Sequence, residues 1–459
     1  MCKKSRGKNS IATIISGRLK RWQDGDIMAM WHELRTRKHS PTARGGQSHK
    51  DAQIRRAKRF AADGLYSRAC EALTSEGLHE FSREIVKELK DLHPPGDLFD
   101  LGPLPDTGAE PLEFSPEQVQ SSLDSFPKDS AHGKSCLKAQ HLKDAVNCKS
   151  PVVADRALSN LTKLVNLLVA GEGVQEVMPF FCGAPLYALK KPEGGARPIA
   201  IGETLRRLVG KCCARDEYTK SICQNLLEPS QMGVSTRCGA EAIVRAVNAI
   251  VDATRDDTDV ALLKVDLRNA FNRVSREVVL KEVDKHAPGL AAWARWCYSE
   301  HSHLWAGSTV IDSAQGVQQG DALGPFLFSL AMQSLISKIQ EKWPDLHLHV
   351  WYLDDGTFIG KRRDLVQILD FLASEEVKTM GFHINLGKCE AWWPEGDPSF
   401  PELPAEIQRV PQAGVKILKV PVGTDEYIAG ELRERISKMS LVTDKLQDLD
   451  DTHAEFTLL

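Results

Sequence analysis

Three aspartates stand in sequence contexts where a carboxylate is unfavourable unless it caps a helix or binds a cation. The first, Asp266, comes near the end of a nearly continuous apolar run, Val260 to Leu267. Such a run predicts a buried strand that delivers the carboxylate just before a helix begins near Arg268. Taken alone, Asp266 is either a helix N-cap or a cation ligand.

Asp354 and Asp355 are adjacent, between an alternating run that ends in Tyr352 and a second apolar run that starts at Gly356. An Asp-Gly step between two strand-like runs is a strong hairpin signal, so both aspartates are expected at a hairpin tip. A plain turn is the ordinary alternative. Two like charges at one apolar-flanked tip repel each other, however, and a divalent cation would relieve that repulsion.

Two further segments carry polar chemistry. The segment LYALKKPEGGARPIAIG predicts a hairpin with Lys190 and Lys191 before its tip and Arg197 after it, and such cations can grip a triphosphate. A solvated surface hairpin is the alternative. The segment GVQQGDALGPFLFSLAM places Gln319 and Gly320 before an apolar helix, where they suit contact with a ligand or simply form a turn.

In this order, the four segments resemble the fingers and palm motifs of reverse transcriptases. The phrases LKKPEGGARPIAIGE, VDLRNAFN, GVQQGDALGPFLFSL and WYLDDGTFIG are most similar to the reverse transcriptase domain of non-LTR retrotransposons (LINE-like RNA-directed DNA polymerases). The resemblance covers roughly Ser115 to Gly423. It implies an α+β right-hand polymerase with an antiparallel palm sheet, helical fingers that carry one hairpin, and a truncated thumb.

The resemblance also implies a two-metal mechanism. Asp266, Asp354 and Asp355 would hold two Mg²⁺ ions, or Mn²⁺, which would activate the primer 3′-hydroxyl and stabilise the leaving pyrophosphate. The triphosphate would be held by the three cations of the hairpin, which are Lys190, Lys191 and Arg197.

The same resemblance implies roles for five other residues. Phe271 would exclude a 2′-hydroxyl by sterics, or it is merely a core residue of its helix. Gln319 and Gly320 would lie against the template and the incoming nucleotide, and Tyr352 near the primer end. Lys388 would protonate the leaving pyrophosphate, with a surface lysine as the alternative.

The chain departs from the family pattern in several places. In GVKILKVPVG, which resembles the primer-gripping loop, Lys419 stands where relatives often carry Gly, and Ala322 replaces a common Pro. Only the start of a thumb is expected after Gly423. The sequence contains no nuclease motif and no Cys/His cluster.

Charge is distributed unevenly along the chain. The net charge is -3, yet residues 1–60 contain sixteen Lys and Arg against four acidic residues. Such a basic arm suggests phosphate binding, with a solvated or disordered tail as the alternative.

Composition excludes several classes of protein. With 42% hydrophobic and 26% charged residues, the chain is neither collagenous nor wholly disordered. No apolar run is long enough for a membrane span, and the eleven cysteines contain no C-x-x-C pair. We expect an intracellular protein without a membrane partner, and the basic N-terminus is the basis for a nuclear hypothesis.

The sequence predicts an organisation in five parts. They are a basic helical N-terminal region (1–92), a Pro/Gly-rich linker (93–114), N-terminal helices and fingers (115–258), a palm (259–424) and the start of a thumb (425–459).

The expected function is RNA-directed DNA synthesis with an RNA template, a DNA primer and deoxynucleoside triphosphates. One alternative is a catalytically inactive, truncated nucleic-acid-binding remnant. Another is an RNA-dependent RNA polymerase, which would share the carboxylates without needing the bulky Phe271.

Overall fold

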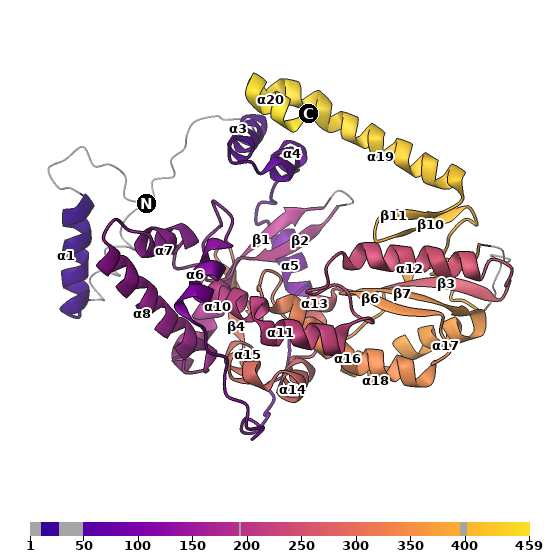
Figure 1. Cartoon of the computed structure of the whole chain (residues 1–459), viewed down its shortest axis with the longest axis horizontal. Coiled ribbons are helices and arrows are strands. Elements are labelled where there is room, and N and C mark those ends of the chain that lie inside the picture. Colours follow the sequence, from indigo (N-terminus) through magenta and orange to yellow (C-terminus); the bar gives the residue numbers. More distant parts are fainter. Residues whose placement is uncertain (1–10, 27–48, 192–193, 395–401) are drawn as a thin grey trace. The chain divides into compact units, whose positions relative to one another are not determined.

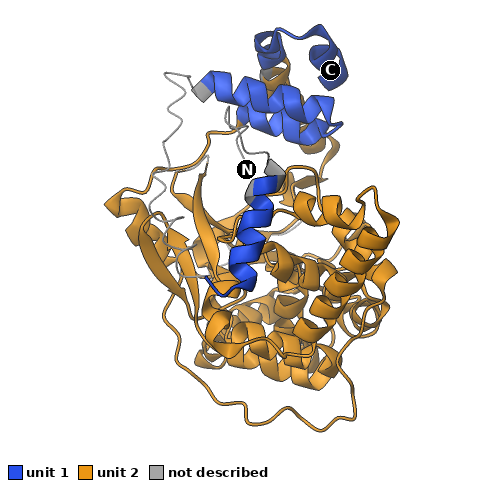
Figure 2. Ribbon diagram, turned by 90° about the vertical axis from the view of Figure 1, so that its left-hand side faces the viewer, with its two compact units in different colours: residues 1–74, 444–459 blue, residues 75–443 orange. Residues whose placement is uncertain are grey.

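The computed structural model describes residues 11–26, 49–191, 194–394 and 402–459 of the 459-residue chain. The chain divides into two compact units, one of residues 1–74 with 444–459 and the other of residues 75–443 (Figure 2). All the candidate site residues lie in the larger unit. Many of the helices and strands are labelled in Figure 1.

A five-stranded sheet positions the aspartates, with the strand order β6-β7-β3-β8-β9. Its strands β3, β6 and β7 are labelled in Figure 1. Neighbouring strands are antiparallel except for the parallel pair β8 and β9. The predicted buried strand and the predicted hairpin are both confirmed, as β3 and as the β6–β7 pair. The strands are β3 (Val260–Asp266), β6 (Leu348–Tyr352), β7 (Asp355–Lys361), β8 (Glu390–Trp392) and β9 (Gln408–Arg409).

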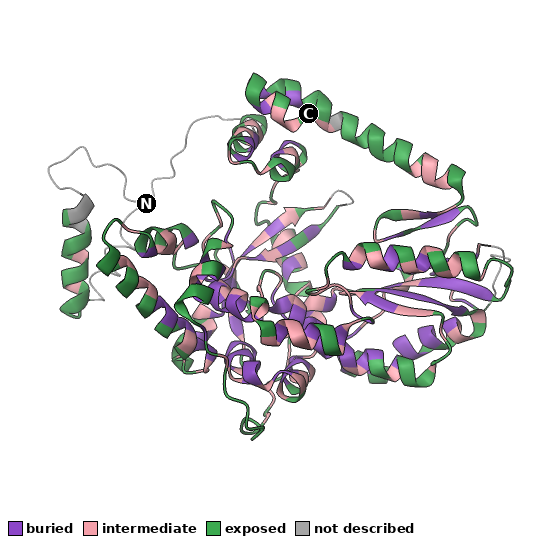
Figure 3. Cartoon of the chain, in the orientation of Figure 1, coloured by how far each residue is buried: buried purple, intermediate pink, exposed green. Residues whose placement is uncertain are grey.

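One face of this sheet packs on the largest apolar core. Because side chains alternate along a strand, Ala261, Leu263 and Val265 all enter that core, where the sheet is buried (Figure 3). The helices that contribute to it include α14 (Arg276–His286), α16 (Gly324–Lys342) and α17 (Arg362–Leu372).

The opposite face, which carries Asp266, is covered only in part. Val260 and Leu262 on this face join a second, smaller core. That core also receives side chains from α12 (Gly239–Ala253) and from the hairpin of β10 (Gly414–Ile417) and β11 (Val420–Gly423). The apolar residues therefore anchor one half of the face and leave the end with Asp266 accessible.

A second sheet has the strand order β2-β1-β4-β5. The predicted cationic hairpin is confirmed as the antiparallel pair β1–β2, and β1 also pairs in parallel with β4. Residues 192–193 at its tip lie outside the described residues. The strands are β1 (Ala184–Lys190), β2 (Ala196–Ala200), β4 (Ser302–Ala306) and β5 (Thr309–Ser313).

Helices make up most of the rest of the larger unit, which agrees with the expected α+β class. None of the helices in the described ranges is long and apolar enough to cross a membrane. The remaining helices, with their bounds, are α6 (Pro116–Asp124), α7 (Ala139–Val146), α8 (Pro151–Val169), η1 (Gln175–Val177), α9 (Met178–Phe181), α10 (Thr204–Arg215), α11 (Glu217–Ile222), η2 (Cys223–Leu227), α13 (Ala270–Arg273), η3 (Pro288–Leu290), α15 (Ala291–Tyr298), α18 (Glu375–Thr379), η4 (Leu386–Lys388) and α19 (Asp425–Leu446).

Residues just before the Pro/Gly-rich segment pack on the cationic hairpin. Helix α5 (Arg83–Asp91) buries Leu89 completely in a core shared with β1 and β2. The Glu88 carboxylate accepts a hydrogen bond from the Ala196 backbone N–H at 2.7 Å, and Leu78 forms a β-bridge with Leu189. This part of the N-terminal region therefore belongs to the larger unit, while the five domain limits themselves stay a prediction.

The smaller unit joins the two ends of the chain. It contains α1 (Ile11–Gln23), α3 (His49–Ala62), α4 (Tyr66–Thr74), η5 (Gln447–Leu449) and α20 (Thr452–Leu458). Helices α3, α4 and α20 share an apolar core, and Lys50 of α3 pairs with Asp448 at 2.8 Å. This basic helix thus contacts an acidic C-terminal segment. Residues 1–10 and 27–48 of the basic arm lie outside the described residues.

The packing of α5 predicts a large effect of one substitution. Leu89→Ala should lower the free energy of unfolding by about 2–5 kcal/mol, because it leaves a cavity under the hairpin. The matched control is Leu98→Ala, since Leu98 is 71% exposed and Leu89 is 0% exposed. Urea denaturation of both variants measures the difference. An equally small loss of unfolding free energy in both variants would contradict the packing described for α5.

Candidate active site

The three predicted aspartates meet at one end of the five-stranded sheet. Asp266 is the last residue of β3 and stands directly opposite Asp355, the first residue of β7. Directly opposed residues on one face have Cβ atoms about 5 Å apart. Asp354 lies in the two-residue turn that joins β6 to β7. The strand register thus gathers carboxylates from two distant segments of the chain.

Burial and mutual repulsion disfavour the charged forms of Asp354 and Asp355. Burial first, and then the charges of Asp355 and Asp266, raise the pKa of Asp354 from an ordinary 3.8 to about 6. Burial and the charge of Asp266 also raise the pKa of Asp355. Nearby ammonium groups oppose this rise in the pKa of Asp355, and they belong to Lys264, Lys419 and Lys388.

Cross-strand partners on this face form three rows of side chains. The row at the end of the sheet consists of Tyr352, Asp355 and Asp266. The next row is polar at three of its four places and consists of Val350, Thr357, Lys264 and Glu390. In it, the Lys264 ammonium pairs with the Glu390 carboxylate at 2.7 Å. The third row is apolar and consists of Leu348, Ile359, Leu262 and Trp392.

A cavity of about 310 Å³ opens beside the carboxylate row. Its volume falls within the range of small-molecule binding sites. Charged residues of both signs line it, and they are Asp266, Asp355, Lys264, Lys388, Glu390 and Lys419. The site therefore combines carboxylates with ammonium groups in one open space.

Gln231 holds the backbone immediately before Asp354. Its buried carboxamide accepts a hydrogen bond from the Leu353 N–H at 2.8 Å and donates one to the Leu353 carbonyl at 3.0 Å. Leu353 has a φ of 56°, a left-handed conformation that costs a residue with a side chain about 1–2 kcal/mol. The two hydrogen bonds compensate for that cost and fix the turn that presents Asp354.

Asn385 orients the carboxylate of Asp266. The Asn385 side-chain amide donates to Asp266 Oδ2 at 2.9 Å, and the Asn385 backbone N–H donates to the Asp266 carbonyl at 2.9 Å. A neutral amide fixes the carboxylate without cancelling its charge. The other carboxylate oxygen of Asp266 is thereby left for a ligand.

The Gln-Gly loop packs closely on two neighbouring segments. The Val317 N–H donates to the Phe271 carbonyl at 2.7 Å, and the Ala200 N–H donates to the Gln319 carbonyl at 3.2 Å. Gly320 has a φ of 120°, and a Cβ there would lie 2.2 Å from the Ala200 carbonyl oxygen. Only glycine fits this close contact. Through its two hydrogen bonds, the loop links the cationic hairpin to the short helix that carries Phe271.

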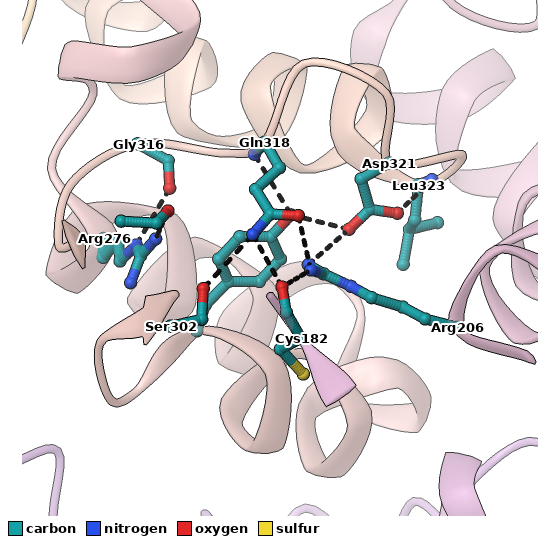
Figure 4. A network of polar contacts seen from close by, with 10 residues as sticks. Cys182, Arg206, Arg276, Ser302, Gly316, Gln318, Asp321 and Leu323 are labelled. Atoms are coloured by element: carbon teal, nitrogen blue, oxygen red, sulfur yellow. Dashed lines mark hydrogen bonds and ion pairs between the residues drawn. The ribbon is translucent and has the colours of Figure 1, made fainter. Parts of the chain in front are cut away.

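Arg206 holds this loop in place through a buried network of hydrogen bonds (Figure 4). It is 2% exposed, donates to Gln318 Oε1 at 2.6 Å and pairs with Asp321 at 2.9 Å. Gln318 also donates to the Cys182 carbonyl at 2.7 Å, and Arg206 donates to the same oxygen. The Tyr298 hydroxyl donates to Asp321 at 2.6 Å. The start of the cationic hairpin and the Gln-Gly loop thus share one rigid support.

Phe271 packs flat against another ring. Its ring lies parallel to that of Phe328, with centroids 4.4 Å apart, and it remains only partly buried. Asn269, at the start of the same short helix, donates to the Leu92 carbonyl at 2.7 Å. The ring is therefore restrained by stacking and is not fully buried.

The predicted residues are not all gathered at the carboxylates. Tyr352 stands opposite Asp355, and Lys388 lines the same cavity. In the described part of the chain, no hydrogen bond or ion pair connects the aspartates to the predicted cations Lys190, Lys191 and Arg197. Gln319 lines a different, much smaller cavity of about 10 Å³, together with Pro198 and Asn272.

The described ranges contain no preformed metal cage. Within them, no three His, Cys, Asp or Glu side chains are arranged to hold a metal ion. The aspartates contribute suitable oxygen donors, but the remaining ligands of any ion would have to come from elsewhere.

Four supporting residues were not predicted from the sequence, namely Gln231, Asn385, Arg206 and Asp321. Of the four, Asp321 could most easily have been found from the sequence, because it directly follows the Gln-Gln-Gly step. Gln231 and Arg206 carry no local pattern, because their partners lie far along the chain. Only the fold reveals them.

Comparison with known proteins gives a family match over half of the chain. The model of the family described as "Reverse transcriptase (RNA-dependent DNA polymerase)" matches residues 189–419. The Retrotransposable element SLACS 132 kDa protein of Trypanosoma brucei gambiense is 24% identical over 312 residues, which are 64% of this chain and 24% of that protein. The chain thus spans about a quarter of the length of this curated relative.

Solved structures are also similar over part of the chain. Telomerase from Candida tropicalis, truncated from its C-terminal domain, is 18% identical with a TM-score of 0.34, covering 49% of this chain and 53% of that one. Telomerase from Candida albicans, in complex with a TWJ fragment of telomeric RNA, is 11% identical with a TM-score of 0.39, covering 53% and 44%.

The raised pKa of Asp354 predicts a pH-dependent loss of stability. Its pKa of about 6 in the folded protein exceeds the ordinary 3.8, so folding becomes less favourable as the pH rises through this window. Without divalent ions, Asp354→Asn should therefore be more stable than the parent above pH ~7, by on the order of 1–3 kcal/mol, and equal to it below pH ~4. Urea denaturation at both pH values tests this, with the exposed Asp370→Asn as control. If Asp354→Asn and the parent differed in stability by the same amount at both pH values, the raised pKa of Asp354 would be contradicted.

The hydrogen bonds of Gln231 predict a loss of stability on truncating its polar end. Gln231→Met keeps the length of the side chain but leaves the partly buried N–H and carbonyl of Leu353 without this partner. We expect the free energy of unfolding to fall by about 2–4 kcal/mol. The same change at the exposed Gln224 should alter it by less than about 0.5 kcal/mol. Similar values for both variants in chemical denaturation would refute the role of Gln231.

Proposed function

This chain belongs to the reverse transcriptase (RNA-dependent DNA polymerase) family, and from that premise we propose that it adds deoxynucleotides to a primer 3′-hydroxyl under the direction of an RNA template. The observation that carries the proposal is the register pair of Asp266 and Asp355, with Asp354 in the adjoining turn, beside an open cavity. Carboxylates gathered in this way suit phosphoryl transfer, in which catalysis is mostly positioning and charge neutralisation.

Reverse transcriptases generally use divalent metal ions, and we assign Mg²⁺ or Mn²⁺ to the three aspartates. Their oxygen donors fit such hard cations in kind. A Mg²⁺ ion in a nucleotide-transferring site is commonly held by one or two carboxylates, waters and substrate phosphates, so three preformed protein ligands are not required. When bound, two such ions would acidify the primer hydroxyl and neutralise charge on the leaving pyrophosphate.

The chain's own residues would bind and orient the nucleotide. Lys190, Lys191 and Arg197 of the cationic hairpin would steady its triphosphate. Gln319 and Gly320 would lie against the base pair being formed, and their loop is tied to this hairpin by the hydrogen bond from Ala200 to Gln319. A rigid loop fits this task, because misplacement of a substrate by 1 Å can slow a reaction about a hundredfold.

Two further residues would act at the reacting end of the primer. Tyr352 stands beside Asp355 in the carboxylate row and would contact the primer terminus. Lys388 lines the cavity and would donate a proton to an oxygen of the leaving pyrophosphate. Its exposed ammonium group is free of ion pairs among the described residues, which suits a transient contact.

The wider assignments follow from the same proposal. Residues 115–258 would form the fingers with their N-terminal helices, 259–424 the palm and 425–459 the start of a thumb. We assign the chain to a non-LTR retrotransposon, and its similarity to a retrotransposable-element protein supports an origin in a mobile element. The proposed reaction itself would require an RNA template and a DNA primer as partners. A nuclear location stays a prediction. An inactive remnant is not favoured, because the three aspartates and their hydrogen-bonded supports are all present.

Primer extension tests the proposed activity. The full chain is incubated with poly(rA), an oligo(dT) primer, dTTP and Mg²⁺, and the length of the primer is measured. Asp354→Asn should reduce extension at least about a hundredfold, since even indirect damage to a metal site costs 10- to 100-fold. Asp370→Asn, an exposed change of the same kind, should extend as the parent does. Equal extension by both variants would exclude the assigned site.

The packing of Phe271 predicts the basis of sugar selection. Phe271→Ala should lower the preference for deoxy- over ribonucleotides by about 10- to 100-fold, because the ring no longer excludes a 2′-hydroxyl. Incorporation of dTTP and UTP is compared in single-turnover assays, with the exposed Phe180→Ala as control. An unchanged preference would mean that Phe271 serves packing alone.

A further inference from the structure

Three cations repeat at every fourth residue along α10 and form what we call the cationic stripe. They are Arg207, Lys211 and Arg215. A helix rises about 1.5 Å per residue, so neighbouring members of the stripe stand about 6 Å apart along its axis. Like charges at this spacing repel each other and weaken a helix. The stripe therefore does not stabilise α10 through its charges, and its presence needs another explanation.

A fourth cation reaches the stripe from α7. Burial first, and then the charges of Arg215, Arg207 and Lys143, lower the pKa of the Lys211 ammonium group. Repulsion among like charges thus acts across two helices that are distant in the sequence. Lys143 and the stripe together form one cationic cluster.

Neutral groups in the segment between α6 and α7 hold these cations in position. Lys143 donates to the Phe126 carbonyl at 2.9 Å, and Lys211 donates to Ser125 Oγ at 3.0 Å. The Lys211 ammonium and the Arg207 guanidinium also lie over the Phe126 ring, 5.1 and 5.6 Å from its centroid. Since these partners carry no charge, they orient the cations without balancing them.

Ion pairs do not balance the cluster either. In the part of the chain that the structure describes, none of its four cations pairs with a carboxylate. By contrast, Arg206 and Lys220, which lie on either side of the stripe in the sequence, each form an ion pair. Arg215 is exposed and Lys211 is partly exposed. The cluster therefore presents positive charge to the solvent.

Two carboxylates close to the stripe in the sequence are engaged with other groups. The charge of Glu203 opposes the lowering of the Arg207 pKa by burial. However, Glu203 already accepts hydrogen bonds from the Ser135 N–H at 2.8 Å and from its hydroxyl at 2.5 Å. Asp216 caps α11 by accepting from the Tyr218 N–H at 2.9 Å. Both carboxylates thus serve local structure.

We propose that the cationic cluster binds the sugar–phosphate backbone of RNA at a site separate from the three aspartates. A row of cations fits a linear polyanion better than a single small anion, and each phosphate contact releases counterions. Arg206, which supports the Gln-Gly loop, lies on a different side of α10 from Lys211. The choice of RNA rests on the function proposed above, because a second contact would retain the RNA between successive additions.

Equilibrium binding of a labelled strand tests this site. Fluorescein-labelled oligo(rU) is titrated with the full chain, and its anisotropy is measured at several salt concentrations. A saturating RNA–DNA hybrid of unrelated sequence, with blunt ends and a dideoxy-terminated primer, occupies the proposed active site throughout. The parent should still bind oligo(rU) under these conditions, and at least as tightly as it binds oligo(dT) of the same length.

Lys211→Gln/Arg215→Gln removes two charges of the stripe. It should bind oligo(rU) about 10- to 30-fold more weakly in about 0.1 M salt, with a salt slope lower by about 1.4, because each phosphate contact with a single strand contributes about 0.7. Lys211→Arg/Arg215→Lys keeps both charges and should bind within about twofold of the parent.

Lys285→Gln/Arg363→Gln is the matched control, because it removes the same charges from exposed positions of α14 and α17. It should also bind oligo(rU) as the parent does. Equal circular dichroism spectra of the variants and the parent show that all of them are folded.

Three results would overturn the proposal. One is equal affinity for oligo(rU) in Lys211→Gln/Arg215→Gln and in the matched control. Another is displacement of oligo(rU) by the hybrid, and the third is tighter binding of oligo(dT) than of oligo(rU).

Primer extension by the parent in the same preparation reports separately on the proposed activity. A parent that extends primers, together with unchanged binding of oligo(rU) in Lys211→Gln/Arg215→Gln, refutes only the role of the cationic cluster. A parent that binds oligo(rU) through the cluster but does not extend primers refutes only the proposed activity.

Discussion

Repulsion between carboxylates that the strand register forces together is the constraint on which the rest of the site depends. Pairing of β3 with β7 fixes Asp266 opposite Asp355, and the turn before β7 keeps Asp354 beside them. The strands cannot slip to separate the charges, because a one-residue shift would expose the apolar row formed by Leu262 and Ile359. The repulsion can therefore be relieved only by protonation or by cations, either the lysines of the cavity or divalent ions brought with the substrates.

Polar side chains from other elements hold the backbone and the carboxylates of the site in place. Gln231 fixes the strained Leu353, Asn385 orients Asp266, and Arg206 fixes the Gln-Gly loop from a separate network (Figure 4). Gln231 and Arg206 each form several hydrogen bonds, and Asn385 holds Asp266 through both its side chain and its backbone N–H. Removal of any one leaves partly or fully buried polar groups unpaired, so the geometry of the site and the stability of the fold are coupled.

Local patterns in the sequence were sufficient to predict the elements that carry the chemistry. The apolar run before Asp266, the Asp-Gly hairpin and the cationic hairpin all have the expected secondary structure. Interactions between distant segments were not predictable in this way. Gln231 contacts Leu353 across more than a hundred residues, and the packing of α5 on the cationic hairpin joins Leu89 and Glu88 to strands about a hundred residues away. The basic N-terminal region likewise gave no sign that Lys50 would pair with Asp448.

The central claim is that the paired aspartates create a site for divalent ions during nucleotide addition. Electron paramagnetic resonance of Mn²⁺ tests it directly, with the full chain, an RNA template, a dideoxy-terminated primer and the matching deoxynucleotide. The parent complex should bind about two Mn²⁺ ions tightly, and Asp266→Asn should lose at least one of them while still binding the primer and template. Equal numbers of tightly bound ions in the parent and in Asp266→Asn would contradict the claim.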